Sequence, residues 1–459
     1  MRPRRLLVEP RVYSVDEALR ANAEEIFELQ RGFVNEKFIE LLDSYRLLRQ
    51  FVKAEGLRVW DSEGREHLDF LCSYGALTLG HNHPVIVDAV RRASSLPNLL
   101  QTAPGSMAAC LASSLAAITP GGLQRSFFAN SGSEAVEGAI KLARAATGRS
   151  RLIATVEGFH GKSMGALSMT GHEPFRTPYY PLLPDVDHVP FGDADALEAC
   201  LRRGNAAAFL VEPIQGPAGI IVPPEGYLRD VRELCDRHGA LMMLDEIQTG
   251  FGRTGRMFAC EHEDVVPDVM CLSKALGGGL YPIGAYITTD EVWRRAYGST
   301  EKCLLHTSTF GGNSLACAAG IAVIQLTVEQ NLPSRAQEIG AYFFSRLRDL
   351  AERHQLIKAV RGRGMMIGVD FTQASEVKDR LLAGVPNQTA SMICVHLLHE
   401  YDIISLYTFA NSRVIRFSPP LVAEREDLDR LVHALDEILT RNDSVLKLAS
   451  STRRLLTKK

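Results

Sequence analysis

Long apolar runs and an excess of charge of one sign are both missing from this chain of 459 residues. No run approaches the roughly 20 apolar residues that a membrane-spanning helix needs, so no membrane span is predicted. The first residues, MRPRRLLVEP, contain only LLV as an apolar stretch. A secretory signal needs about 7–15 apolar residues, so none is expected here. A formal net charge of −3 gives no reason to expect nucleic acid or a membrane surface as a partner.

Paired cysteines are also missing. The nine cysteines are odd in number, and no two of them are spaced as CxxC. This pattern excludes a typical zinc site or disulfide framework and favours reduced thiols in a cytoplasmic protein. Cys271 lies in an apolar run and is expected to be an inert core thiol. In the motif GHNHP, His81 and His83 are separated by one residue and followed by proline, which fits a tight turn better than a metal site.

The middle of the chain alternates short apolar runs with helical patterns. Apolar residues make up 46% of the chain and charged residues 23%, values typical of a globular protein. Apolar strands alternating with helices predict an α/β fold with a mostly parallel sheet covered on both faces. Helices are expected at 133–147 and 231–239. The predicted strands are 125–130, 151–156, 206–213, 240–246, 268–273 and 283–289.

Both ends of the chain are expected to build a smaller α+β domain. Residues 16–53 predict amphipathic helices, residues 57–71 predict a hairpin, and the basic C-terminal tail is expected to be frayed. After about residue 330 the predicted elements are helix 334–353, strand 365–371, helix 388–401, strand 415–418 and a last helix, 425–440. The predicted division is 1–75 for an N-terminal segment that joins the small domain, 76–335 for the large domain and 336–459 for the C-terminal small domain.

The residues that follow each strand are candidates for a site, because ligands of an open α/β sheet collect at the carboxyl ends of its strands. The sequence SGSE at 131–134 follows the first predicted strand and begins a helix. Amides at a helix N-terminus bind anions, Gly132 allows close approach, and Ser133 adds a hydroxyl. Ordinary helix capping by serine and glutamate explains the same residues.

Three further side chains follow other strands. Phe159 lies in a glycine-flanked loop, where an aromatic ring can stack on a flat ligand or anchor the loop. Asp245 ends an apolar strand and needs a cation or several donors when buried. Lys274 ends another such strand, just before three consecutive glycines, and has no charge partner in its own segment. A surface lysine at a strand end is the alternative for Lys274 alone.

Together these side chains match one ligand, pyridoxal phosphate. The phosphate fits a helix N-terminus, the ring fits a flat apolar face, the ring nitrogen fits an acid, and the aldehyde fits a lysine amine. Asp245 would keep the pyridinium protonated. Burial would lower the pKa of Lys274 and make its amine more nucleophilic.

Seven motifs then carry a resemblance to a known family: GHNHP (80–84), SGSEA (131–135), EPIQG (212–216), LDEIQTGFGRTG (244–255), LSKALGGG (272–279), HTSTFGGN (306–313) and RFSPPL (416–421). They resemble the class III, fold-type I aminotransferases, from about residue 50 to residue 440. The putrescine and ornithine aminotransferase branch is the most similar. RMFACEHEDVVPD and HTSTFGGN favour putrescine aminotransferase. The resemblance implies pyridoxal phosphate, a seven-stranded-type sheet with a small domain from both chain ends, and a homodimer with shared active sites.

The resemblance also implies a role for each matching residue. Lys274 is the Schiff-base lysine and the proton-transfer base, and Asp245 pairs with the pyridine nitrogen. Arg416 takes a substrate carboxylate. The implied cofactor neighbours are Gly132 and Ser133 at the phosphate, Phe159 and Ile247 on the two ring faces, His160 nearby, Gln248 at the ring hydroxyl and Thr309 at the phosphate of the neighbouring subunit.

Two departures bear on the substrate. Ornithine and acetylornithine aminotransferases read EPIQGE, in which the last glutamate holds the substrate arginine, whereas this chain has Pro217 there. Lys162 replaces an arginine that grips ornithine, although Tyr74 matches an ornithine-site tyrosine. We expect a terminal primary amine or an amino acid as donor and an aldehyde or 2-oxo acid as acceptor. An ornithine or acetylornithine aminotransferase and an enzyme that aminates a larger biosynthetic aldehyde or ketone are the alternatives.

Two further points stay open. Glu212 is expected to form hydrogen bonds near the cofactor or to support its loop, with proton transfer as the less favoured role. The glycines at 277–279 allow a different class of protein, a regulatory protein that binds a nucleotide or phosphate. No GxxxxGK[ST] loop is present and no GxGxxG follows the first strand, which argues against that class.

Overall fold

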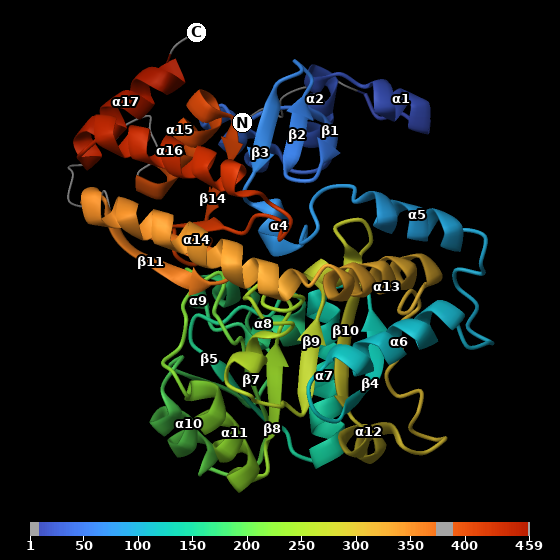
Figure 1. Ribbon diagram of the computed structural model, residues 1–459. Coiled ribbons are helices and arrows are strands. Elements are labelled where there is room, and N and C mark those ends of the chain that lie inside the picture. Colours follow the sequence, from blue (N-terminus) through green and yellow to red (C-terminus); the bar gives the residue numbers. More distant parts are fainter. Residues whose placement is uncertain (1–8, 373–388, 458–459) are drawn as a thin grey trace.

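The computed structural model describes residues 9–372 and 389–457, and its centre is a sheet of seven strands in the order β4-β10-β9-β8-β7-β5-β6 (Figure 1). From β9 to β6 neighbouring strands are parallel, whereas β10 is antiparallel to both β4 and β9. The strands are β4 (Leu123–Ala129), β5 (Arg151–Thr155), β6 (Val186–Val189), β7 (Ala206–Val211), β8 (Leu241–Asp245), β9 (Val269–Leu272) and β10 (Gly284–Thr289). The predicted α/β fold with a mostly parallel sheet is confirmed.

Helices cover both faces of this sheet, which explains why its inner strands are mostly apolar. One face packs against α7 (Gly132–Thr147), α8 (Met164–Met169) and α12 (Asp290–Tyr297). The other face packs against α6 (Ser106–Ile118), α10 (Ala194–Leu201), α11 (Tyr227–His238) and α13 (Ser314–Glu329). Short connecting elements are α5 (Pro84–Ala93), α9 (Glu173–Arg176), η1 (Thr177–Tyr179), η2 (Ala259–His262) and η3 (Lys274–Gly277).

The smaller part combines the two ends of the chain, and the long helix α14 (Leu332–Arg353) crosses between it and the large sheet (Figure 1). Its sheets have the orders β1-β2-β3-β13 and β11-β12-β15-β14. The N-terminal elements are α1 (Val15–Arg20), α2 (Ala23–Phe33), α3 (Glu36–Ser44), β1 (Phe51–Glu55), β2 (Arg58–Asp61), β3 (Glu66–Asp69) and α4 (Cys72–Gly75). The C-terminal elements are β11 (Ile357–Arg363), β12 (Met366–Phe371), α15 (Thr389–Tyr401), β13 (Ile403–Ile404), β14 (Leu406–Tyr407), β15 (Val414–Phe417), α16 (Arg425–Arg441) and α17 (Val445–Thr457).

The pairing of β13 with β3 joins the two ends in one sheet, as the sequence predicts. The domain boundaries after residues 75 and 335 stay predictions. Among the described residues no single helix is long and apolar enough to cross a membrane, although α13 and α14, bent by 66°, pass that test as a pair.

Several local predictions are wrong. Residues 51–53 belong to strand β1 and not to a helix, because Phe51 starts a hairpin with β2. The tail forms α17, which packs against α15 through buried Leu448 and Thr452. The half-polar strand β6 and the strand β11 are not predicted, since neither has a continuous apolar run. Residue 388 of the predicted helix 388–401 and most of the N-terminal basic run lie outside the described residues.

Candidate active site

Lys274 lies at the carboxyl end of β9, where it begins the short helix η3 with a φ of 36°. Its side chain is largely buried and borders a cavity of about 280 Å³. Within the described residues its amine has no hydrogen bond or ion pair. Burial lowers the pKa of Lys274 to about 8, although the nearby charge of Asp245 acts in the opposite direction. An accessible, partly neutral amine is the form that attacks a carbonyl carbon.

Asp245 ends β8 on the neighbouring strand, and its position is fixed from two sides. One carboxylate oxygen, Oδ2, lies 2.7 Å from Nδ1 of His160, and the other accepts the amide of Ile247 at 3.1 Å. The backbone amide of His160 donates to Thr170 Oγ1 at 3.0 Å, which anchors the loop. Asp245 is only 4% exposed, so it forms a rigid acidic group beside Lys274.

The N-terminus of α7 contributes the predicted anion-binding amides. Ser131 caps the helix by accepting the amide of Glu134 at 3.2 Å, so the capping interpretation holds for Ser131. The first-turn amides of Gly132 and Ser133 have no acceptor within a helix and are free for a ligand. A side chain at Gly132 would clash with Ile247, because its Cβ would lie 2.8 Å from Cδ1 of Ile247. The glycine thus allows Ile247 to pack against the helix end.

Most predicted cofactor neighbours line the same cavity. The predicted residues on its wall are Gly132, Ser133, Phe159, His160, Lys162, Glu212, Asp245, Ile247, Gln248 and Lys274. Glu212 accepts the amides of Phe159 at 2.8 Å and Gly216 at 3.2 Å, which joins two loops of the wall. Burial raises the pKa of Glu212 to about 7. Gln248 Nε2 is buried and has no hydrogen-bond partner among the described residues. It is therefore available to donate to a ligand.

Arg416 and Tyr74 form a pair next to this cavity but do not line it. The Arg416 guanidinium carbon lies 4.7 Å from the centroid of the Tyr74 ring. Arg416 is 2% exposed, has no ion pair or hydrogen bond among the described residues, and its burial lowers its pKa to about 10. Lys162 is exposed, and its Nζ lies 4.8 Å from the ring centroid of Phe175. Pro217, in place of the family glutamate, lines the cavity.

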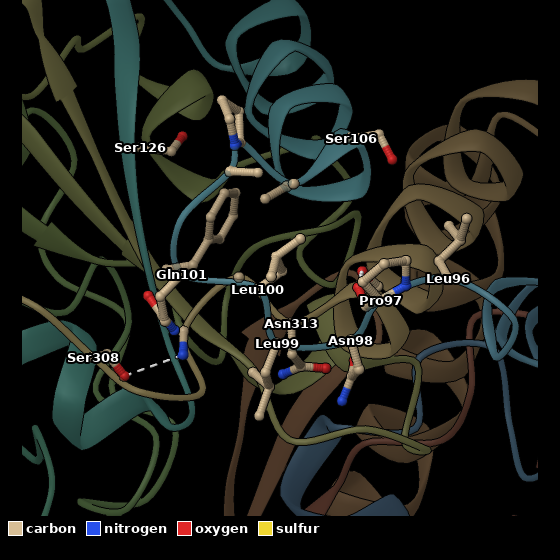
Figure 2. A pocket seen from close by; sticks show the side chains of 18 of the residues that line it. Leu96, Pro97, Asn98, Leu99, Leu100, Gln101, Ser106, Ser126, Ser308 and Asn313 are labelled. Atoms are coloured by element: carbon tan, nitrogen blue, oxygen red, sulfur yellow. Dashed lines mark hydrogen bonds between the residues drawn. The ribbon is translucent and has the colours of Figure 1, made fainter.

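Thr309 lies in an exposed segment and does not line the cavity beside Lys274. Its carbonyl oxygen accepts from Gln101 Nε2 at 2.9 Å. This segment borders a separate cavity of about 410 Å³, between residues 96–106 and 308–314 (Figure 2). Thr309 therefore does not join the other predicted cofactor residues in the structure of this chain.

Sequence reasoning missed part of the site's surroundings. Ser73, His81 and Tyr281 line a cavity of about 520 Å³ that also borders Lys274. The GHNHP motif was the signal for His81, which lies 3.0 Å from Asp69 Oδ2. In the described ranges no group of three or more His, Cys, Asp or Glu side chains is arranged to hold a metal ion. Gly278 and Gly279 serve packing, since side chains there would clash with Ile86 and Leu77.

The arrangement fits pyridoxal phosphate. Four features surround one cavity: the Lys274 amine and the Gln248 amide, neither with a partner in the described part of the chain, the anchored carboxylate of Asp245, and the first amides of α7. Phe159 and Ile247 supply apolar surface on its walls. Each chemical group of the cofactor therefore has a matching side chain or amide in the same place.

The pKa of Lys274 predicts how covalent uptake of the cofactor depends on pH. Because only the neutral amine reacts, the uptake rate of the apo protein should rise about tenfold per pH unit below pH 8 and level off above it. The rate is measured by stopped-flow absorbance after mixing with pyridoxal phosphate. A free-lysine pKa would make the rate keep rising to about pH 10, which would contradict the assigned environment.

Comparison with known proteins supports the same conclusion. Residues 43–439 match the family model "Aminotransferase class-III". The ornithine aminotransferase of Toxoplasma gondii is 30% identical, with a TM-score of 0.81 over 96% of this chain and 100% of that one. The acetylornithine aminotransferase of Elizabethkingia anophelis is 32% identical, with a TM-score of 0.73 over 89% of this chain and 99% of that one.

An amine transaminase from an uncultivated Pseudomonas species, whose structure contains bound PLP, is 28% identical, with a TM-score of 0.75 over 86% of this chain and 95% of that one. The family match covers well over half of the chain and includes all the residues around Lys274. The chain belongs to the class-III aminotransferases, and it is a transaminase that depends on pyridoxal phosphate.

Proposed function

We propose that this transaminase takes the amino group of a terminal primary amine, a diamine such as putrescine or another ω-amino compound, and transfers it to a 2-oxo acid. The observation that carries the reaction is the partnerless amine of Lys274 beside the anchored carboxylate of Asp245. The observation that carries the acceptor is Arg416, a buried cation with no anionic partner among the described residues.

The residues around the cavity have different roles in the reaction. Pyridoxal phosphate, when bound, supplies an aldehyde that exchanges amino groups and a ring that withdraws electrons. Lys274 would hold the cofactor covalently, and its Nζ would then move a proton. Asp245 would keep a proton on the ring nitrogen, and His160 holds this carboxylate at 2.7 Å. The amides of Gly132 and Ser133 would bind the phosphate.

The remaining wall residues orient the ring. Phe159 and Ile247 would contact its two faces, and Gln248 Nε2, unpaired among the described residues, would donate to the ring hydroxyl. Glu212 supports this wall, because it holds the Phe159 amide at 2.8 Å. These contacts keep the reacting atoms in one geometry and limit the access of water.

The substrate assignment rests on the two departures from the ornithine-type pattern. With Pro217 in place of a glutamate, no carboxylate at that position competes for Arg416, which stays available to an acceptor carboxylate. Lys162 replaces the arginine that grips ornithine, which favours a donor without an α-carboxylate. Ornithine or acetylornithine is the second candidate donor, favoured by Tyr74 and by the similarity to aminotransferases of both names. Amination of a larger aldehyde or ketone is a third use of the same chemistry.

We also propose that two copies of the chain form a homodimer, with Thr309 of each subunit completing the phosphate site of the other. Thr309 is exposed, and exposed apolar side chains lie close to it in the sequence. Leu304 is 76% exposed, Leu305 is 66% exposed and Phe310 is 55% exposed. The adjacent cavity in Figure 2 is framed by residues 96–101, which include the half-exposed Leu100. A second subunit would bury this apolar surface.

Replacing Arg416 with glutamine is expected to weaken the binding of a 2-oxo acid and raise its KM about thirtyfold or more, because a buried charge-assisted contact to its carboxylate is lost. An aldehyde acceptor without a carboxylate should keep its KM within about twofold of wild type, since it makes no such contact. Steady-state kinetics with 2-oxoglutarate and a simple aldehyde as alternative acceptors measures both effects.

The matched control is Arg413→Gln, on the same segment but exposed and near Asp370 at 3.6 Å. It should change neither KM. If Arg416→Gln binds 2-oxoglutarate with an unchanged KM, Arg416 has no part in acceptor binding.

The donor is tested by single-turnover spectra of the holoenzyme with putrescine, ornithine, lysine and glutamate in turn. Putrescine is expected to bleach the visible band of the bound cofactor faster than the α-amino acids do. Bleaching by ornithine at a much higher rate would favour the second candidate. No change with any amine or amino acid would contradict the proposed reaction.

A further inference from the structure

The turn that carries Tyr74 has a strained backbone. Cys72, Ser73 and Tyr74 have φ values of 45°, 48° and 59°, and Gly75 follows at 86°. A left-handed conformation is unfavourable for each residue with a side chain, because its Cβ lies too close to the following carbonyl oxygen. Such strain persists only where surrounding contacts hold the chain in place, and it is concentrated near functional sites.

Asp69 holds the beginning of this turn. Its Oδ1 accepts the amides of Leu71 at 3.0 Å and Cys72 at 2.9 Å, and its carbonyl oxygen accepts the Cys72 thiol at 2.8 Å. Its Oδ2 lies 3.0 Å from Nε2 of His81. Asp69 is 8% exposed, so these contacts fix both carboxylate oxygens in a largely dry environment.

His81 is itself clamped against the N-terminal hairpin. Its backbone exchanges two hydrogen bonds with Gly56, at 2.8 and 3.0 Å. A side chain at Gly80 would lie 2.7 Å from the Gly56 backbone, so the two segments touch directly. The side-chain amide of Asn82 donates to the carbonyl oxygen of Ala54 at 2.9 Å. These backbone contacts of the GHNHP motif thus hold the His81 ring in place beside the turn.

The far end of the turn contacts Arg416. The Tyr74 ring lies 4.7 Å from the Arg416 guanidinium carbon and 5.7 Å from the ring centroid of Phe409. Because Arg416 has no hydrogen bond among the described residues, its direction depends on packing against Tyr74. A chain of contacts therefore runs from His81 through Asp69 and the strained turn to Arg416.

We propose that Asp69 and His81 are positioning residues for the acceptor: they hold the left-handed turn that sets Tyr74 against Arg416, and so orient the guanidinium for the acceptor carboxylate. This inference rests on the proposed role of Arg416. His81 also lines the cavity beside Lys274, so a direct contact with the amine donor is the competing role.

The test compares two Michaelis constants, the acceptor KM with 2-oxoglutarate and the donor KM with whichever of putrescine, ornithine and lysine reacts fastest. His81→Leu removes the contact to Asp69, whereas His81→Gln keeps an N–H donor for it. We expect His81→Leu to raise the acceptor KM about tenfold, because small misplacements of a binding group are costly. The donor KM and the rate of the donor half-reaction should stay unchanged. His81→Gln should restore most of the acceptor affinity.

Two further variants test whether the change in the acceptor KM is transmitted through Asp69 and Tyr74. His83→Leu, from the same motif but without a contact to Asp69, should leave both KM values unchanged. In a Tyr74→Leu background, His81→Leu should cause no further rise in the acceptor KM, because both changes act through the same contact. If His81→Leu does not fold, His81→Asn replaces it, since its shorter amide does not reach Asp69 Oδ2.

An equal rise in both KM values, the same rise in His83→Leu, additive effects with Tyr74→Leu, or an unchanged acceptor KM in His81→Leu would each overturn the inference. Arg416→Gln separates this failure from that of the proposed function. If Arg416→Gln raises the acceptor KM and His81→Leu does not, only the positioning role fails. If Arg416→Gln has no effect either, the proposed acceptor site fails.

Discussion

Replacing Lys274 with alanine is expected to lower kcat about ten-thousandfold or more. The variant loses both the amine that holds the cofactor and the base that moves the proton, and a proton-transfer group alone contributes about 10²–10⁴-fold. Burial of Lys274 and its lowered pKa of about 8 are the physical reasons to assign it both roles. Turnover assays and the visible spectrum of the purified variant measure the two losses separately.

Two controls make this result specific. Lys358→Ala removes an exposed lysine of β11 and should keep full activity. Added methylamine should recover part of the Lys274→Ala activity, since a free amine can carry the proton in the vacant space. Retained turnover in Lys274→Ala, at more than about a tenth of wild type, would contradict the assigned chemistry.

Replacing Asp245 with asparagine is expected to lower kcat about a thousandfold and to leave the cofactor covalently bound. The amide keeps the shape of the carboxylate but cannot hold a proton on the ring nitrogen through a negative charge. The 2.7 Å contact with His160 also loses its charge, which weakens it. Single-turnover kinetics with the donor measures the loss, and absorbance or borohydride trapping measures bound cofactor.

Asp264→Asn is the matched control, because Asp264 is an exposed acid in a turn. It should react at the wild-type rate. Asp245→Asn with wild-type single-turnover kinetics would show that the carboxylate only supports the fold. An Asp245→Asn variant without any bound cofactor would show that Asp245 is needed to bind the cofactor, and not to keep a proton on its ring nitrogen.

The positions of Lys274 and Asp245 could be predicted from sequence because each residue lies at the carboxyl end of an apolar strand. Lys274 comes after β9 and Asp245 ends β8, and neighbouring parallel strands bring their carboxyl ends together. The helix N-terminus at Gly132 follows from the same rule. The large sheet was predictable for the related reason that its inner strands are apolar on both faces.

Contacts between distant parts of the chain could not be predicted in this way. Tyr74 meets Arg416, and His81 meets Asp69 across a left-handed turn, and neither contact has a local pattern in the sequence. The family resemblance predicted Tyr74 and Arg416 as substrate residues. It did not predict the contact between the Tyr74 ring and the Arg416 guanidinium. Helix α17 was missed because only a few of its side chains are buried, and its basic residues are typical of a frayed tail.

The most direct test of the role of Lys274 is to reduce the holoenzyme with borohydride, digest it, and locate the pyridoxyl group by mass spectrometry. We predict one modified site, Lys274, in the peptide that contains CLSKALGGG, and loss of the label in Lys274→Ala. A label on another lysine, or none in a protein reconstituted with pyridoxal phosphate, would contradict the assignment of Lys274 as the residue that holds the cofactor.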